Sequence, residues 1–386
     1  MKVNKLIIAA AGAGKTTSLV EEAYGSKENV LITTFTEENE MEIYDKFIKK
    51  YGYVPAHITI QTWFSFLLQH GVKPYQGACH KIMFERQING IMLVNQQSGL
   101  KYKFRQGRKE VPVYYSEETE FELHYFTKDM MLYTDKLAKF VIRANEKSKG
   151  NVIDRISRLF PTIYIDEVQD LAGYDLEIVK ELYHSGANVI CVGDLRQVTY
   201  YTHSERKNKS YKHGMIKQYV LNECFASDHI DIDEISLAKS HRNNKQICDF
   251  SSLIYPIFPQ VQPCDCVDCH PTDVEHQGVF LVKASEVDSY LEKYQPVQLR
   301  HNVKVKTDSK FCSLNFGKSK GKTFDRVIIY PTTDIKNWLV NKNTNLADKM
   351  RAALYVAVTR ARYSVAFVVP DSECEIINSI DIWEKD

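Results

Sequence analysis

The chain has 386 residues, of which 44% are hydrophobic and 26% are charged. This composition excludes a disordered, collagen-like or disulfide-scaffold chain, and the length predicts two or three domains. A formal net charge of +1 excludes a strong overall field toward nucleic acid or membrane, so any basic surface must be local. The odd number of nine cysteines favours reduced thiols in a cytoplasmic protein, and no apolar run is long enough to predict a membrane span.

Short apolar runs alternate along the chain with segments of helical periodicity, which is typical of βα units and mostly parallel sheets. The predicted strands are residues 6–9, 30–34, 58–61, 162–165, 188–192, 278–282, 326–330 and 364–369. The predicted helices are residues 15–23, 37–50, 174–184 and 347–362. We therefore expect an α/β fold.

Two stretches break this alternation. Residues 78–154 are charged, aromatic and helical in pattern, and predict an inserted helical subdomain. Residues 255–302 hold several prolines and a cysteine cluster, and predict a short irregular insert. Basic runs at residues 101–110 (KYKFRQGRKE) and 206–217 suit a groove that follows a nucleic-acid backbone, although a solvated charged face explains such runs equally well.

A glycine-containing segment, AAAGAGKTT at residues 9–17, follows the first apolar strand and opens a helix. Backbone N–H groups of such a loop point at phosphates, the lysine reaches the β- and γ-phosphates, and the next hydroxyl ligates Mg²⁺. The candidate nucleotide-binding residues are Ala11, Gly12, Ala13, Gly14, Lys15, Thr16 and Thr17. Because Ala9 replaces the first glycine of the general pattern, a glycine-rich turn with an exposed lysine remains the alternative.

Two carboxylates end another apolar strand, in TIYIDEVQDL at residues 162–171. Asp166 would hold Mg²⁺, and Glu167 would orient or deprotonate a water that attacks a phosphate. A solvated acidic turn is the alternative. Together with the glycine-containing loop, the pair predicts ATP hydrolysis.

Eight segments, in this order, resemble the motifs of UvrD/Rep/PcrA-like superfamily 1 helicases. They are AAAGAGKTT, LITTFTEENEMEI, IQTWFSFL, IDEVQD, VGDLRQVTY, KSHRNNKQI, GKSKGKTFDRVII and LYVAVTRAR. The resemblance implies two RecA-like P-loop NTPase cores that clasp one ATP, the first formed by residues 1–77 and 155–238 and the second by residues 239–386. It also implies a translocase or helicase that moves 3′ to 5′ along single-stranded DNA, with RNA not excluded.

The resemblance further implies roles for single residues. Gln197 would sense the γ-phosphate, and Arg242 and Arg360 would reach the same phosphate, whose charge spreads in the transition state. His241 and Gly321 would contact the nucleotide. The residues expected to face single-stranded nucleic acid are Phe35, Thr36, Thr62, Trp63, Phe64 and Tyr200. Aromatic rings stack on any base, but a ring beside a strand is as often part of a core.

The sequence departs from the family in several places. Glu37 and Glu38 put negative charge where relatives carry an Asn-Lys pair, and Thr323 replaces a glutamate that holds the ribose. The upstream adenine-reading motif is expected to be missing, and only about 75 residues stand where relatives carry a large accessory subdomain. Reduced helicases of this kind serve beside a nuclease in the Gabija antiphage system, which makes antiviral defence with a nuclease partner an analogy. A regulatory ATPase switch acting on such a partner, with weak or no helicase activity, is the alternative function.

A cysteine cluster, CDCVDCH at residues 264–270, lies in the second irregular stretch. Thiolates and imidazole are the ligands that Zn²⁺ prefers, so Cys264, Cys266, Cys269 and His270 are candidate ligands of a structural zinc ion. A second CxxC pair at the usual distance is absent from the sequence, and reduced free thiols are the alternative.

Overall fold

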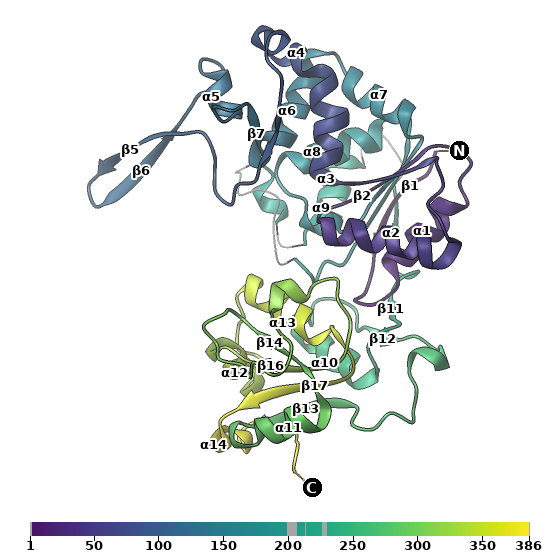
Figure 1. Ribbon diagram of the computed structural model, residues 1–386, viewed down its shortest axis with the longest axis vertical. Coiled ribbons are helices and arrows are strands. Elements are labelled where there is room, and N and C mark those ends of the chain that lie inside the picture. The colour runs from purple at the N-terminus through teal and green to yellow at the C-terminus, as the bar shows by residue number, and fades with distance from the viewer. Residues whose placement is uncertain (1, 199–206, 213, 226–229, 386) are drawn as a thin grey trace. The chain divides into compact units, whose positions relative to one another are not determined.

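A computed structural model describes residues 2–198, 207–212, 214–225 and 230–385 (Figure 1). The expected nucleic-acid contact at Tyr200 and the basic residue Arg206 lie outside these ranges. The chain forms two compact units, which we describe separately. The first unit comprises Met1–Ile7, Thr16–Gly193 and Tyr200–Asp233, and the second unit comprises Ile8–Lys15, Asp194–Thr199 and Glu234–Asp386.

The first unit is built on a six-stranded sheet in the order β10-β1-β9-β8-β2-β3. Its strands are β1 (Asn4–Ile8), β2 (Val30–Thr34), β3 (Ile58–Thr62), β8 (Thr162–Ile165), β9 (Asn188–Gly193) and β10 (Asp231–Asp233). The strand pairs β1–β10, β2–β3, β2–β8 and β8–β9 are parallel. All residues of β2 are buried, as expected for a central strand of a parallel sheet, and this explains its unbroken run of apolar and threonine residues.

Helices connect these strands. They are α1 (Lys15–Tyr24), α2 (Glu37–Tyr51), α3 (Trp63–Phe66), α4 (Gln76–Cys79), α5 (Phe121–Tyr125), α6 (Thr134–Lys147), α7 (Asn151–Leu159), α8 (Tyr174–His184) and α9 (Ile216–Tyr219). The ends of α2 show why the sequence is helical there: the Thr36 side chain accepts a hydrogen bond from the N–H of Asn39, and Gly52 closes the helix with φ 80°. Among the described helices, none is long and apolar enough to cross a bilayer.

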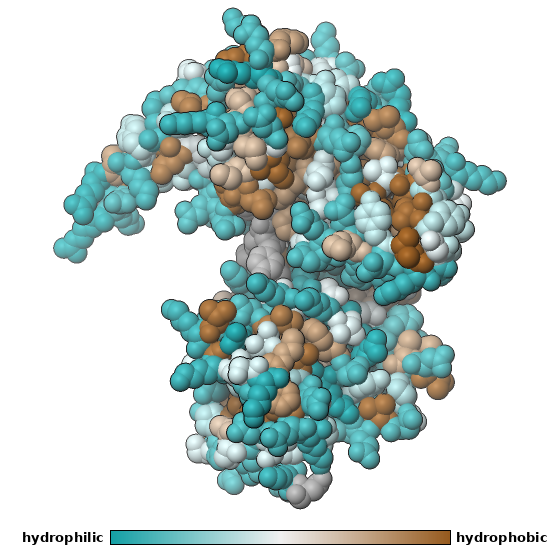
Figure 2. Space-filling view, in the orientation of Figure 1, coloured by the Kyte–Doolittle hydropathy of each residue, from teal (hydrophilic) through white to brown (hydrophobic). Residues whose placement is uncertain are grey.

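The inserted segment at residues 78–154 departs from the expected helical subdomain because it also contains two pairs of strands. It contains α5, α6 and α7, the short strands β4 (Gly90–Met92) and β7 (Met131–Tyr133), and an antiparallel hairpin of β5 (Leu100–Gln106) and β6 (Lys109–Tyr114). The basic run KYKFRQGRKE forms this hairpin, because its charged and aromatic residues alternate with a strand period and Gly107 turns with φ 62°. The arm that carries β5 and β6 is mostly hydrophilic on its surface (Figure 2).

The second unit has its own six-stranded sheet, in the order β15-β14-β16-β17-β13-β18, and all its strand pairs are parallel. Its strands are β13 (Gly278–Lys283), β14 (Val297–Arg300), β15 (Ser313–Asn315), β16 (Phe324–Tyr330), β17 (Ala361–Val369) and β18 (Asp381–Ile382). Its helices are α10 (Lys245–Ile254), α11 (Val287–Tyr294), α12 (Thr333–Val340), α13 (Asp348–Val358) and α14 (Asp371–Cys374). A two-stranded parallel sheet of β11 (Lys239–Ser240) and β12 (Gln262–Pro263) precedes them.

The predicted α/β fold with two parallel sheets is confirmed, and the predicted strands all form. Two sequence predictions are wrong in their boundaries. The helix expected at residues 347–362 ends at Val358, because the chain turns at Thr359 and Ala361 already pairs with Phe324 as the start of β17. The irregular insert expected at residues 255–302 ends near residue 277, since β13 and β14 belong to the second sheet and α11 lies between them in the chain. The prolines at positions 256, 259, 263 and 271 all precede this point, and Pro296 directly precedes β14.

Candidate functional site

Three strands of the first sheet end at the same edge, and each is followed by predicted site residues. The register pairs Thr34 of β2 with Thr62 of β3, and Thr33 of β2 with Ile165 of β8. Phe35, Trp63 and Asp166 therefore follow directly at this edge. Open α/β sheets bind their ligands outside the carboxyl ends of their strands, so the sheet order itself gathers these residues.

The two carboxylates after β8 are held by the turn that carries them. Asp166 is only 4% exposed, and its N–H donates to the carbonyl of Thr33 at 2.8 Å. Its Oδ1 accepts a hydrogen bond from the N–H of Glu167 at 2.9 Å. Glu167 has a left-handed backbone with φ 55°, an uncommon conformation for a glutamate, and the side-chain amide of Gln169 donates to its Oε2. The turn thus fixes the direction of the Glu167 carboxylate.

The glycine-containing loop follows β1, and its two glycines have left-handed backbone angles. Gly12 and Gly14 have φ values of 72° and 80°, which glycine adopts without strain, and the N–H of Ala13 donates to the carbonyl of Ala10 at 3.3 Å. Lys15 is the first residue of α1. Successive N–H groups in such a loop, followed by a helix N-terminus, form an anion-binding surface.

The first of the two threonines that follow Lys15 lies at the start of α1, and the second joins α1 to a neighbouring helix. The hydroxyl of Thr17 accepts a hydrogen bond from Nζ of Lys46 at 3.2 Å, which ties α1 to α2. Thr16 is partly exposed in the first turn of α1. Its position keeps it as the expected magnesium-ligating hydroxyl.

The segment KSHRNN lies directly on this loop within the second unit. The hydroxyl of Ser240 donates to the carbonyl of Ala11 at 2.8 Å, and the N–H of His241 donates to the carbonyl of Gly12 at 2.9 Å. A Cβ atom added to Gly12 would lie 2.6 Å from Cβ of Arg242. Glycine is therefore required at position 12 for its backbone angle and for the close approach of this segment.

Arg242 and Gly321 both flank the start of β17. Nη1 of Arg242 donates to the carbonyl of Thr359 at 3.2 Å. Gly321 stands in an exposed turn with φ 82°, and the carbonyl of the next residue, Lys322, accepts a hydrogen bond from Nη1 of Arg360 at 3.3 Å. The predicted nucleotide contact at Gly321 is thus one residue away from a group that positions Arg360.

Arg360 is 2% exposed and is held by groups from several segments. Its Nε donates to the carbonyl of Val356 at 3.0 Å, and its Nη2 donates to the hydroxyl of Thr359 at 3.2 Å. Nη2 also donates to Oε1 of Gln197 at 3.2 Å. The second unit therefore brings together two residues for which the sequence predicts contact with the same phosphate.

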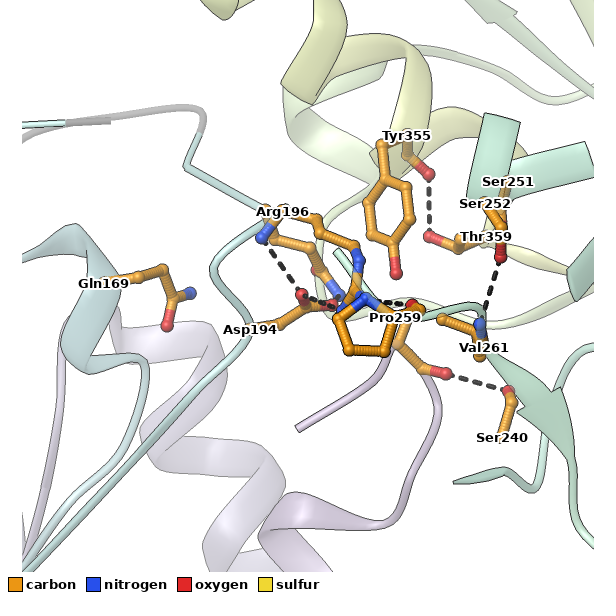
Figure 3. A network of polar contacts seen from close by, with 12 residues as sticks. Gln169, Asp194, Arg196, Ser240, Ser251, Ser252, Pro259, Val261, Tyr355 and Thr359 are labelled. Atoms are coloured by element: carbon orange, nitrogen blue, oxygen red, sulfur yellow. Dashed lines mark hydrogen bonds and ion pairs between the residues drawn. The ribbon is translucent and has the colours of Figure 1, made fainter. Parts of the chain in front are cut away.

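Several polar residues that the sequence prediction missed support this pair (Figure 3). Asp194 is fully buried and accepts hydrogen bonds from Nε2 of Gln197 at 2.8 Å and from the N–H of Arg196 at 3.1 Å. Arg196 donates from Nη2 to the carbonyl of Pro259 at 2.8 Å and lies 4.9 Å over the ring of Phe258. The signal was in the sequence: three polar residues, Asp194, Arg196 and Gln197, follow the buried strand β9 within four positions.

One further residue positions the segments that carry the arginines, and a buried tyrosine lies close to them in the chain. Asn243 is buried and donates from Nδ2 to the carbonyls of Thr359 and Ala361, at 3.2 and 2.7 Å. Tyr355 is also buried, and desolvation raises its pKa well above the usual range, with the Asp194 carboxylate adding to the effect. Its hydroxyl therefore stays protonated at any physiological pH.

The structure separates the expected nucleic-acid contacts into buried and accessible groups. The expectation for Trp63 is corrected: the ring is 1% exposed, and its Nε1 donates to Oδ1 of Asp175 at 2.7 Å. A buried indole needs such a partner, and this ring belongs to the core. Phe35 and Phe64 are partly exposed and meet edge-on, with ring centroids 5.6 Å apart.

Thr36 and Thr62, also expected to face nucleic acid, act locally as helix caps. Thr36 accepts a hydrogen bond from the N–H of Asn39, and Thr62 accepts one from the N–H of Ser65 at 3.2 Å. The exposed side chains of Glu37 and Glu38 follow Thr36 in the first turn of α2. Negative charge is favourable at a helix N-terminus, so these glutamates also have a structural role.

The cysteine cluster gathers a histidine that the sequence placed elsewhere. His241, Cys264 and Cys269 each offer a ligand atom, and these atoms lie within 4.8 Å of one another. His270, which the sequence predicted as a ligand, has its Nε2 3.5 Å from Sγ of Cys264 and 3.2 Å from the carbonyl of Ser240. Among the described residues this is the one group of three or more potential metal ligands.

Comparison with known proteins gives one family match. The sequence model of the UvrD/REP helicase N-terminal domain matches residues 114–204, a range that contains Asp166, Glu167 and Gln197. The matched range also contains the IDEVQD and VGDLRQVTY segments, and it covers less than half of the chain. A search of curated protein sequences returns no match.

Solved helicase structures resemble the chain at low sequence identity. The arterivirus nonstructural protein 10 helicase, as seen in its crystal structure, is 14% identical in sequence to this chain. The match covers 97% of this chain and 62% of the helicase, with a TM-score of 0.45. In its complex with DNA the same helicase is 14% identical to this chain, and the match covers 97% of this chain and 63% of the helicase. The PRRSV helicase is also 14% identical, and the match covers 96% of this chain and 53% of that helicase. Both matches have a TM-score of 0.44. The chain therefore spans less than two thirds of the length of these proteins.

Proposed function

We propose that this protein is an ATP-hydrolysing translocase of the superfamily 1 helicase type that moves 3′ to 5′ along single-stranded DNA. The observation that carries the proposal is the hydrogen bond between Arg360 and Gln197, which are 163 residues apart in the chain. A predicted arginine finger in contact with a predicted γ-phosphate sensor gives one route by which hydrolysis is coupled to movement.

The chemistry follows from two sets of groups. The N–H groups of the glycine-containing loop and the ammonium of Lys15 bind the β- and γ-phosphates, while Arg242 and Arg360 stabilise the charge of the phosphoryl group in transfer. Glu167 orients or deprotonates the attacking water. The hydroxyl of Thr16 and the carboxylate of Asp166 are hard oxygen ligands that fit Mg²⁺, which neutralises phosphate charge when it is bound.

Two surfaces of the first unit support binding of single-stranded DNA. Phe35 and Phe64 offer partly exposed rings at the carboxyl ends of β2 and β3, where bases stack independently of sequence. The β5–β6 hairpin offers exposed basic residues interleaved with exposed aromatic ones, Tyr102 and Phe104 among them. Such a combination suits a strand backbone and its bases together.

The second candidate function is a regulatory ATPase switch that acts on a partner protein such as a nuclease. Two observations favour it: the Trp63 ring is buried in the core, and Glu37 and Glu38 are exposed beside Thr36. Both weaken the surface expected to hold DNA. A cytoplasmic antiviral-defence role would suit this switch by analogy with reduced helicases of the Gabija type.

Steady-state ATP hydrolysis, measured with and without a single-stranded oligonucleotide, separates the two functions. We expect the oligonucleotide to stimulate hydrolysis, and Glu167→Gln to lower kcat by about 10²- to 10⁴-fold through loss of the base. Glu118→Gln, at an exposed carboxylate of the inserted segment, is the matched control and keeps the wild-type rate. An equal rate with and without DNA would reject the translocase in favour of the switch.

Polarity is tested by displacement of streptavidin from biotinylated oligonucleotides. A 3′-to-5′ translocase displaces streptavidin from the 5′ end and leaves the 3′ end occupied. Faster displacement from the 3′ end would overturn the proposed direction while leaving ATP-driven movement intact.

A further inference from the structure

The group of His241, Cys264 and Cys269 has the dimensions of a zinc site. A tetrahedral zinc ion with ordinary Zn–S and Zn–N bonds separates a sulfur from a nitrogen ligand by about 3.6 Å. Nδ1 of His241 and Sγ of Cys269 lie 3.7 Å apart, and Sγ of Cys264 completes a triangle within 4.8 Å. Three ligands from two separate segments thus already face one another.

Cys266 supplies the chemistry of a fourth ligand. It forms a C-x-x-C pair with Cys269, and the two thiols are in contact. The N–H groups of Cys269 and Asp268 hydrogen-bond to Cys266, an arrangement in which a backbone turn holds a thiolate ligand.

His270 has a different role from that of the metal ligand that the sequence predicted. Its Nε2 lies 3.2 Å from the carbonyl of Ser240, a distance at which a neutral imidazole donates its N–H to that carbonyl. The nitrogen that carries this proton cannot ligate a metal at the same time. His270 therefore holds the main chain of β11 beside the cluster.

We propose that Cys264, Cys266, Cys269 and His241 bind a structural zinc ion, and that this ion fastens the KSHRNN segment to the phosphate-binding loop. The first half of the proposal stands on the geometry of His241, Cys264 and Cys269 and on the C-x-x-C spacing that joins Cys266 to Cys269. The second half rests on the proposed function, because it assigns the fastened loop to nucleotide binding.

The connection from the ion to the loop runs through two short hydrogen-bonded steps. The N–H of Cys264 donates to the carbonyl of Ser240 at 2.8 Å, and the hydroxyl of Ser240 donates to the carbonyl of Ala11 at 2.8 Å. On the histidine side, the N–H of His241 donates to the carbonyl of Gly12 at 2.9 Å. An ion that holds the His241 side chain therefore also holds its main chain against the loop.

The surrounding segment explains why an ion is useful there. Residues 255–277 contain little regular structure, and apolar side chains such as Ile257 and Val267 are 78% and 82% exposed. A segment that buries so little apolar surface gains order from a metal ion, since binding energy then becomes folding energy.

Metal content of the purified full-length chain tests the site itself. Under reducing conditions we expect about one zinc ion per chain by elemental analysis, and a thiolate-to-cobalt charge-transfer band after exchange with Co²⁺. Cys269→Ser and His241→Ala should lose the zinc and the band. Cys312→Ser, at an exposed cysteine of the same unit, is the matched control and should keep both.

Several outcomes would overturn the site. A wild-type chain without zinc that gives no thiolate band with Co²⁺ rejects it, and this measurement does not depend on whether any variant folds. Retention of zinc by Cys269→Ser rejects it as well. If His270→Gln loses zinc while Cys266→Ser retains it, the fourth ligand is His270 and the assignment of Cys266 is wrong.

The coupling to the loop is tested by the affinity for a fluorescent ATP analogue before and after zinc is removed by a chelator. We expect removal to weaken binding by about 5- to 150-fold, the usual range for coupled sites, and zinc to restore it. Unchanged affinity would reject the coupling. A chain that binds zinc but hydrolyses no ATP would reject the proposed function and leave the zinc site standing.

Discussion

The two six-stranded sheets have the candidate site residues beside them at opposite ends of their strands. In the first unit, Phe35, Trp63 and Asp166 follow the carboxyl ends of β2, β3 and β8. In the second unit, Arg360 directly precedes β17, whose first residue, Ala361, pairs with Phe324 at the start of β16. One sheet therefore uses its carboxyl edge, and the other its amino edge.

The two edges differ in the backbone groups that they offer to charged groups: N–H groups at the carboxyl edge of the first sheet, and carbonyl groups at the amino edge of the second. Helices begin after the carboxyl ends of the first sheet, and the N–H groups of their first turns favour anions. Helix α13 ends just before the amino edge of the second sheet, where its last carbonyls have no partner within the helix. The carbonyls of Val356 and Thr359 hold the guanidinium groups of Arg360 and Arg242. Carbonyl groups favour cations, so the amino edge of the second sheet suits the two arginines. The helix starts at the carboxyl edge of the first sheet suit negative charge.

We expect the largest effect at the amino edge of the second sheet, at Arg360. Arg360→Lys keeps the positive charge but loses the planar fork that bonds Val356, Lys322 and Gln197. We expect kcat for ATP hydrolysis to fall by about 10³- to 10⁵-fold, as for loss of an arginine finger, while the ATP analogue still binds.

Arg362→Lys is the control for this measurement. Arg362 is exposed two residues further along β17, where it pairs with Asp325 at 3.7 Å. An equal loss of kcat in both variants would show that β17, rather than the Arg360 guanidinium, sustains hydrolysis.

A smaller effect is expected at the carboxyl edge of the first sheet. Gly193 ends β9, and an added Cβ atom would lie 2.3 Å from Oε1 of Gln169 and 3.0 Å from Cγ1 of Val168. Gly193→Ala therefore displaces the amide that bonds Glu167, and we expect it to lower the free energy of unfolding by about 1–3 kcal/mol and to lower kcat. Gly186→Ala, whose nearest atom would be 3.9 Å away, should change neither quantity in denaturant melts and ATPase assays.

The smallest expected effects compare two neighbouring aromatic residues. Trp63→Phe leaves the buried Asp175 without its indole donor, so the free energy of unfolding should fall by about 1–3 kcal/mol with unchanged affinity for a single-stranded oligonucleotide. Phe64→Ala should show the reverse, with DNA binding weakened by about 1–3 kcal/mol and a smaller loss of stability. If Trp63→Phe loses affinity for DNA and Phe64→Ala does not, then Trp63, rather than Phe64, contacts the DNA.

Local signals were enough to predict much of the fold. Strands β2 and β8 were predicted at their observed bounds because buried strands of a parallel sheet need short, continuous apolar runs. The loop after β1 was predicted because a glycine-containing segment stands between an apolar strand and a helix, and its Gly12 and Gly14 have backbone angles that glycine takes readily. The hairpin at residues 100–114 was missed, since its alternation of basic and aromatic residues lies within a segment that reads as helical.

The sequence by itself determined the candidate residues that follow a strand or open a helix: Lys15, Asp166 and Glu167 are placed by their immediate neighbours along the chain. Only the tertiary structure decided which distant side chains meet. It put Arg360 on Gln197, His241 beside Cys264 and Cys269, and the Trp63 indole on Asp175. The physical reason is that strand order and the hydrogen-bond partners of buried polar atoms join segments far apart in the chain, and no local periodicity records those pairings.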